Sequence, residues 1–137
     1  MAWLRRAGVP VMASEAEHRL AMHQRLVEEG AVSFLQVAPV ACGGISRLRE
    51  LSELVAGTDI RLSLEVSSTA LALLAACHFA ASVDAVVHVE WHSVHQVFFD
   101  TLPEPRISGG QYQLPQGLGI GIDVPVSEMS MAFESRI

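Results

Sequence analysis

Short apolar runs and longer helical stripes alternate along the first hundred residues of the chain. Runs typical of β-strands lie at 9–13, 32–38, 60–65 and 85–90, and each precedes a stretch of helical periodicity, at about 15–29, 44–56, 67–81 and 92–100. Strands that alternate with helices indicate a parallel sheet with right-handed crossovers. The pattern therefore predicts an α/β fold built from four successive βα units.

Signals at the ends of the predicted helices support this division. Ser14, with Glu17 three residues later, fits a capping box before the first helix. Gly30 and Gly57 follow the first and second helices, at the position where glycine commonly ends a helix. Residues 67–69, Ser-Ser-Thr, precede the third helix and are predicted to cap it.

The pattern changes after residue 101. Two prolines and the turn Ser108-Gly109-Gly110 follow, with short extended pieces at 111–114 and 118–124, and the last residues have no periodicity. The pattern divides the chain into the βα units over 1–101 and a C-terminal extended tail over 102–124, and it predicts disorder over 125–137.

One face of each predicted strand collects polar residues toward its C-terminal end. Side chains alternate between the two faces of a strand, so each face can be read from the sequence. The polar face holds Val11, Ala13 and Glu15; Phe34, Gln36 and Ala38; Arg61, Ser63 and Glu65; and Val86, His88 and Glu90. A doubly wound sheet buries both faces, whereas a (β/α) barrel directs polar strand ends into one mouth. We therefore expect a partial (β/α) barrel.

Three glutamates, Glu15, Glu65 and Glu90, end successive strands in the same phase. Any one of them alone is more simply explained as a helix-capping or solvated charge. Three together favour a shared site. Carboxylates that face one another repel unless a cation lies between them, and oxygen ligands select a hard ion such as Mg²⁺.

The stretch VVHVEWHSVHQVFFD, residues 86–100, has the density of histidines expected of a metal site. Only His88 and Glu90 share the polar face of the predicted strand, whereas His92 and His95 follow it. Their spacing matches no common zinc pattern, and neither cysteine is placed to add a ligand. The stretch is better interpreted as a strand that presents Glu90.

Composition excludes several function classes. A net charge of −6 without a basic block argues against nucleic-acid binding, and the absence of lysine excludes a lysine base or Schiff base from this chain. The two cysteines have no CxxC spacing, which favours a reducing cytoplasm over a disulfide framework. No apolar run reaches the roughly 18–20 residues needed to span a membrane.

Several motifs resemble the mandelate racemase and muconate lactonizing enzyme group of the enolase superfamily. Residues 9–46 resemble the segment through the fifth and sixth barrel strands, with Gly43-Gly44-Ile45 correctly spaced after Gln36. EVSSTALALLAACHFAAS resembles the seventh strand end and its helix, VVHVE the eighth strand, and LPQGLGIGID the closing tail. The resemblance covers residues 2–124. It implies half of a (β/α) barrel over 1–101, with strands 5–8 of a TIM-like barrel, and a β-tail over 102–124 that packs on a capping domain.

The resemblance implies roles for individual residues. Glu15 falls on a magnesium ligand, and Glu90 on the eighth-strand carboxylate that donates a proton to the developing enediolate; Gln36 and His88 are expected to contact the substrate. The substrate class implied is a sugar acid or related carboxylate, which loses its α-proton in a dehydratase or racemase reaction.

The sequence departs from the group at the Asp-His dyad. Ala38 takes the Asp position and Glu65 the His position, so Glu65 could act as base only if burial raised its pKa. The capping domain and two metal ligands of the family have no counterpart in these residues. A second chain or a homo-oligomer is then expected to complete the barrel, and a catalytically inactive half-barrel or structural homodimer is the alternative to an enzyme.

Overall fold

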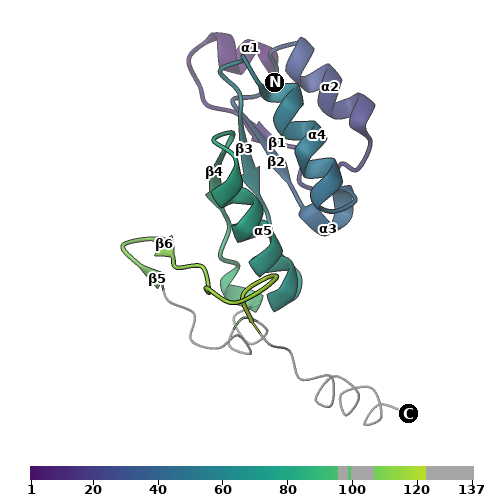
Figure 1. The fold of residues 1–137 in the computed structure, drawn as a ribbon. Coiled ribbons are helices and arrows are strands. Elements are labelled where there is room, and N and C mark those ends of the chain that lie inside the picture. The colour runs from purple at the N-terminus through teal and green to yellow at the C-terminus, as the bar shows by residue number, and fades with distance from the viewer. Residues whose placement is uncertain (96–98, 100–106, 123–137) are drawn as a thin grey trace, which may run out of the picture.

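Four short parallel strands form one sheet in the computed structural model, which describes residues 1–95, 99 and 107–122. Their order in the sheet is β1 (Met12–Ala13), β2 (Phe34–Val37), β3 (Arg61–Leu64) and β4 (Val86–Val89). Strands adjacent in sequence are adjacent in space (Figure 1), as successive βα units require. The α/β fold with four parallel strands of a partial barrel is confirmed.

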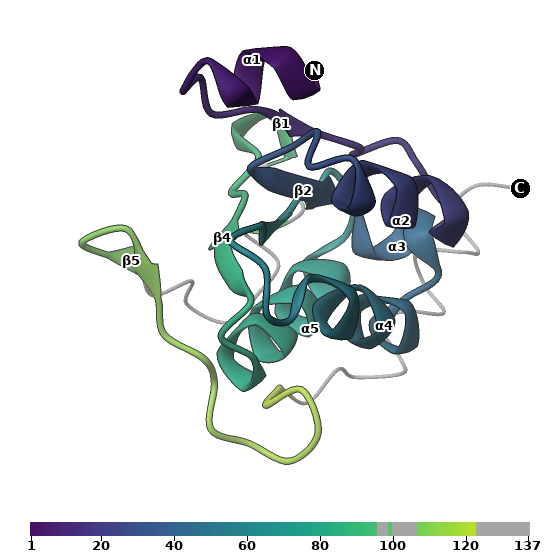
Figure 2. The ribbon, with the colours of Figure 1, turned by 90° about the horizontal axis from the view of Figure 1, so that it is seen from above.

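The main helices cover one face of this sheet. A short α1 (Ala2–Arg6) precedes β1, and the helices that follow the strands are α2 (Leu20–Glu28), α4 (Ile45–Val55) and α5 (Ala70–Ser82), with a small α3 (Pro39–Cys42) before α4. Seen from above, α2 to α5 gather on the same side of the strands (Figure 2). None of the described helices covers the opposite face, which leaves an open wall rather than a closed barrel.

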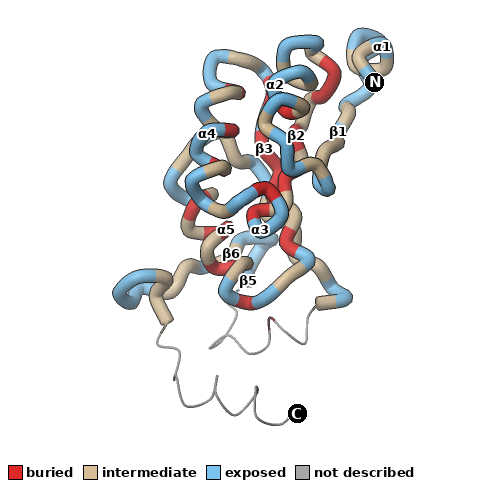
Figure 3. The backbone as a smooth tube through the Cα atoms, turned by 90° about the vertical axis from the view of Figure 1, so that its right-hand side faces the viewer, coloured by how far each residue is buried: buried red, intermediate tan, exposed pale blue. Residues whose placement is uncertain are grey.

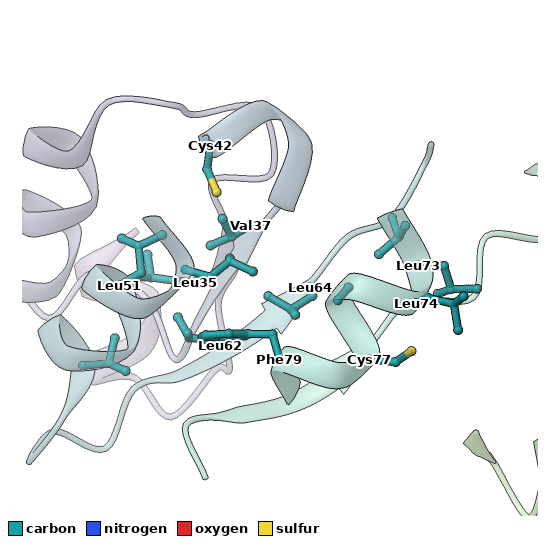
Figure 4. Packing of buried hydrophobic residues seen from close by; sticks show 14 of the residues in the cluster. Leu35, Val37, Cys42, Leu51, Leu62, Leu64, Leu73, Leu74, Cys77 and Phe79 are labelled. Atoms are coloured by element: carbon teal, nitrogen blue, oxygen red, sulfur yellow. The ribbon is translucent and has the colours of Figure 1, made fainter. Parts of the chain in front are cut away.

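The hydrophobic core lies between the sheet and these helices (Figures 3 and 4). Leu35 and Val37 of β2, and Leu62 and Leu64 of β3, are fully buried. They meet buried side chains of α4 and α5: Leu48, Leu51 and Val55, and Leu73, Leu74 and Phe79. Each fully buried leucine contributes roughly 1.5–3 kcal/mol of transfer free energy, so β2 and β3 form the stable centre of the sheet.

The start of the first long helix was predicted wrongly. α2 begins at Leu20 rather than near residue 15, and its N-cap, Arg19, has no side-chain capping bond. Instead of forming a capping box with Ser14, the Glu17 carboxylate accepts bonds from the amides of His18 and Arg19 and from the Arg19 guanidinium. These bonds hold the pKa of Glu17 at about 2, because each of them favours the ionised form.

The predicted faces of the outer strands also need correction. Ala13 pairs with Leu35 and lies on the helix side, together with Val11, so the phase predicted for β1 is off by one residue. In β4, Val86 pairs with Leu62, but an irregularity then makes His88 the partner of Ser63. Val86 therefore packs against the core, whereas His88 keeps its predicted face.

The link between α3 and α4 is a pair of glycines with left-handed backbone angles. Gly43 has φ +110° and Gly44 has φ +81°, conformations that disfavour residues with a Cβ atom. The two residues form a tight turn between the helices.

The tail carries a small hairpin, β5 (Ile107–Ser108) with β6 (Gln111–Tyr112), where a strand over 111–114 was predicted. Residues 118–122 form a turn, with the Gly121 amide donating to Leu118, rather than the predicted extended piece. The His78 Nε2 of α5 lies 3.0 Å from the Ile120 carbonyl and joins this turn to the helix. The predicted disorder over 125–137 lies outside the described residues.

Of the helix predicted over 92–100, the described residues show a 3₁₀ turn, η1 (Ser93–His95), and a helical Phe99. Residues 96–98 and 100 lie outside the part of the chain that the structure describes.

Candidate functional site

A cleft of about 480 Å³ lies at the C-terminal ends of the four strands. Its lining joins residues that follow β1, β2, β3 and β4, so each βα unit contributes to it. The lining residues are Glu15, Ala16, Gln36, Ala38, Ala41, Glu65, Ser67, Glu90 and His92. All three glutamates that the sequence singled out therefore border the same cleft.

Glu15 reaches the cleft through a local distortion after β1. The preceding residue, Ser14, has φ +94° and is the one non-glycine among the described residues with positive φ. Its hydroxyl donates a 2.9 Å hydrogen bond to the Gln36 carbonyl of β2, which fixes the turn to the neighbouring strand. The distortion compensates for the reversed phase of β1, because Glu15 lines the cleft although Ala13 faces the helices.

Glu65 and Glu90 reach the cleft by regular extension of the sheet. The Glu65 amide donates to the Val37 carbonyl at 2.9 Å, and the Glu90 amide donates to the Leu64 carbonyl at 2.8 Å. These bonds continue the parallel ladder by one residue past β3 and β4. Both side chains are half-buried. The Gln36 amide nitrogen lies 3.4 Å from a Glu90 carboxylate oxygen and orients that side chain across the sheet.

The two positions at which the sequence departs from the Asp-His dyad both border the cleft. Ala38 is the N-cap of α3 and Glu65 ends β3. The methyl group of Ala38 can neither orient a base nor hold a proton. The titratable side chains among the lining residues are Glu15, Glu65, Glu90 and His92.

His88 does not line the cleft. It is exposed on the polar face of β4, with its ring centroid 5.7 Å from that of Phe34. The contact between His88 and a substrate therefore stays a prediction, for a residue outside the lining of the cleft.

His92 does line the cleft, although sequence reasoning gave it no role. Its imidazole stacks on that of His95, with ring centroids 4.6 Å apart and planes 25° apart. The spacing of three residues was visible in the sequence, but only the 3₁₀ turn shows that it brings the rings together.

The donor chemistry of the cleft suits a hard cation, but the donor set is incomplete. The carboxylates of Glu15, Glu65 and Glu90 are the oxygen ligands that Mg²⁺ prefers. Among residues 1–95, 99 and 107–122, however, no group of three His, Cys, Asp or Glu side chains comes close enough to hold a metal ion. The three carboxylates of the cleft therefore do not by themselves form a metal site in this part of the chain.

A second hollow, of about 590 Å³, lies between α5, Trp91 and the β5–β6 hairpin. Leu73, Cys77, Tyr112 and Leu114 are among its lining residues. Burial raises the pKa of the Cys77 thiol to about 11, and it raises that of Tyr112 as well. These two groups are neutral at pH 7, so the charged side chain in the lining of this hollow is Glu90, which also borders the first cleft.

The comparisons with known proteins agree with this geometry. Residues 1–128 match the family described as "Enolase C-terminal domain-like". A protein of the mandelate racemase/muconate lactonizing enzyme type from Labrenzia alexandrii DFL-11 superposes with a TM-score of 0.80 at 21% identity, over 94% of this chain and 34% of its own. No curated protein sequence matches the chain significantly.

Two further solved structures have the same fold. A mandelate racemase/muconate lactonizing enzyme-like protein from Roseovarius sp. TM1035 gives a TM-score of 0.76 at 24% identity, covering 93% of this chain and 32% of that one. A member of the enolase superfamily from Salmonella Typhimurium gives 0.78 at 21% identity, covering 89% and 32%.

The class defined by this fold is the C-terminal barrel domain of enolase-like proteins. The chain belongs to that family, and its structural relatives are members of the mandelate racemase branch of the enolase superfamily. It spans about a third of the length of these relatives. No helix in the described residues is long and apolar enough to cross a membrane.

Proposed function

We propose that the chain forms one wall of the active site of a magnesium-dependent enzyme that removes the proton α to the carboxylate of a sugar acid, in a dehydratase or racemase reaction. The observation that carries this proposal is the meeting of Glu15, Glu65 and Glu90 at one cleft, each from a different strand end. Three carboxylates around one hollow repel one another, and a cation offsets that repulsion.

In this proposal each carboxylate has a separate role. Glu15 is a ligand of Mg²⁺, together with oxygen ligands from outside the described residues. Bound Mg²⁺ would stabilise the negative charge that develops on the substrate carboxylate. Glu90, oriented by Gln36, delivers a proton to the substrate, and Glu65 is the candidate base.

We further propose that a partner segment completes the barrel, supplied by a second chain, a second copy or the remainder of a longer polypeptide. The outer strands β1 and β4 carry large apolar side chains that are open to solvent. Met12 is 44% exposed and Val87 is 45% exposed. Exposed apolar edge strands favour pairing with another strand. The compartment that we propose is the cytoplasm, because both cysteines are free and buried.

The proposal is tested by Mg²⁺ binding and α-proton exchange on the chain together with the partner segment that completes its barrel. Isothermal titration calorimetry should show Mg²⁺ binding to the wild type that is weakened at least tenfold in Glu15→Gln, because the metal loses a charged ligand. Proton NMR in D₂O should show loss of the α-proton signal in at least one of a panel of sugar acids. Glu28→Gln is the matched control, since Glu28 is exposed on α2 and is not among the lining residues of the cleft.

Absence of both Mg²⁺ binding and α-proton exchange would contradict the enzymatic proposal. That result would favour the second candidate, an inactive half-barrel that persists as a structural unit. The observation in favour of this alternative is Ala38, which places a methyl group where the family has a carboxylate. Light scattering coupled to size exclusion then decides between an isolated monomer and a homodimer that closes its edges.

A further inference from the structure

We propose that His92 is a hydrogen-bond donor that holds the hydroxyl or carboxylate oxygens of the substrate in the cleft, and that His95 fixes its imidazole by stacking. This inference rests on the proposed function for the class of substrate. It concerns two residues outside the strands, to which neither the fold nor the three glutamates give a role.

The first argument is a shortage of donors in the cleft. Glu15, Glu65 and Glu90, when ionised, only accept hydrogen bonds. Gln36 already directs its amide nitrogen toward Glu90. A sugar acid presents many oxygen acceptors, and each of them loses hydrogen bonds to water when the molecule enters the cleft. These acceptors therefore need donors from the protein in exchange. Of the remaining polar side chains that line the cleft, His92 and Ser67, only His92 is half-buried, whereas Ser67 is exposed.

The second argument is the state of the His92 ring. Its Nδ1 atom is buried and has no hydrogen-bond partner in the described residues. A buried N–H without an acceptor is costlier than an unpaired acceptor nitrogen, so the proton of the neutral ring resides on Nε2. The half-buried ring borders the cleft, which leaves the Nε2–H edge as the one that can meet a ligand there.

The third argument is the support that His95 gives. The His95 amide donates a 2.9 Å bond to the His92 carbonyl and closes the 3₁₀ turn. Residues three apart in such a turn eclipse one another, and here the two imidazoles stack with centroids 4.6 Å apart. A ring that is already held loses less conformational freedom when a ligand binds. His95 is thus a positioning residue, and His92 is the residue that touches the substrate.

The experiment uses the full chain, labelled with ¹⁵N, together with the partner segment that completes its barrel, and long-range ¹H–¹⁵N spectra of the imidazoles of the labelled chain. Without ligand, His92 should show the Nε2–H tautomer. Addition of Mg²⁺ and sodium D-gluconate should shift the His92 nitrogens while leaving those of His18, an exposed residue before α2, in place.

Affinity for D-gluconate in the presence of Mg²⁺ then separates the roles. His92→Phe keeps the stack but removes the donor, and it should weaken binding about tenfold, the effect of one lost hydrogen bond to a charged group. His92→Gln returns an amide donor and should recover part of that loss. His95→Phe preserves stacking and should bind as the wild type does, His95→Ala should bind a few times more weakly, and His18→Gln should show no change. Circular dichroism and Mg²⁺ titration on each variant check that the fold and the metal site persist.

The possible negative results differ in meaning. If the wild type binds Mg²⁺ and D-gluconate but His92→Phe binds equally well, the inference about His92 is wrong and the proposed function stands. If the wild type binds Mg²⁺ but neither D-gluconate nor any other sugar acid of the panel, the substrate class is wrong, and the role of His92 fails with it. A His92 ring with its proton on Nδ1 would also overturn the inference.

Discussion

Ser14 offers a direct test of how the chain turns from β1 into the cleft, through the pair of variants Ser14→Ala and Ser14→Gly. Two terms act at this position. The hydroxyl bond to the Gln36 carbonyl, 2.9 Å long and partly buried, contributes about 1 kcal/mol. The backbone at φ +94° costs an L-residue about 1–2 kcal/mol, a cost that glycine does not carry.

These terms predict different results for the two variants. Ser14→Ala loses the bond and keeps the strain, so its free energy of unfolding should fall by about 1 kcal/mol. Ser14→Gly loses the bond, is relieved of the strain and orders a more flexible backbone at a cost of about 0.5–1 kcal/mol, so it should remain within about 0.5 kcal/mol of the wild type.

Urea unfolding followed by far-UV circular dichroism measures both variants, and equal slopes against urea concentration validate the comparison. Ser46, an exposed residue within α4, provides the control. There the order should reverse, with alanine more stable than glycine by about 0.5–1 kcal/mol. The reasoning is refuted if Ser14→Ala proves as stable as Ser14→Gly.

Three further predictions concern the rest of the chain. Thr69 is the N-cap of α5, and its hydroxyl accepts a bond from the Ala72 amide. Thr69→Ala should therefore lower the free energy of unfolding by about 1 kcal/mol in urea melts, while Thr69→Ser stays near the wild type. Equal losses in both variants would contradict the capping role. The pKa of the Cys77 thiol is raised by burial from 9.0 to about 11, so the folded state holds this proton more tightly than the unfolded state; its contribution to stability is complete below pH 9 and is lost as the pH rises toward 11. Cys77→Ala should flatten this decline in thermal melts, and an unchanged slope would argue against it. His23 is fully buried, its ring nitrogens have no partner of ordinary geometry in the described residues, and burial lowers its pKa. The free energy of unfolding should therefore fall as the pH drops below 6.5, and His23→Leu should remove that part of the acid dependence. Unfolding curves between pH 5 and 7 that are equally steep in both proteins would disprove this.

The centre of the fold could be predicted from the sequence because hydrophobic pattern alone determines it. β2, β3 and α4 lie within the segments predicted for them, and α5 ends one residue past its segment. Leu62 and Leu64 alternate with polar residues, α4 carries a clear apolar stripe, and α5 is apolar on nearly every side. Thr69 caps α5 as the sequence indicated.

The edges of the sheet could not be predicted, because local exceptions rather than periodicity determine them. The positive φ of Ser14 and the irregular pairing beside Val87 each shift the side-chain phase by one residue, and neither leaves a signal in the sequence. Glu15 and Glu90 both line the cleft, as predicted. For Glu15 this holds only because two deviations compensate: the reversed phase of β1 and the distorted residue after it.

The sequence predicted the three carboxylates of the candidate site but not its imidazole. Glu15, Glu65 and Glu90 follow strand ends, so the fold class places them at one mouth. His92 follows the last strand by an irregular turn, and its stack on His95 depends on a 3₁₀ geometry that the spacing alone did not distinguish from a loop.

The brevity of β1 has a consequence for ligand binding. This strand contributes just two residue pairs to the sheet, whereas β2 and β3 are paired over four residues and hold the fully buried leucines. Hydrogen exchange should therefore be fastest at β1, through openings that leave the centre intact. Glu15 lies two residues after β1. A ligand held by Glu15 therefore favours the state in which β1 is paired with β2, and it slows exchange at β1. The pairing of β1 and the occupancy of the cleft are thus thermodynamically linked.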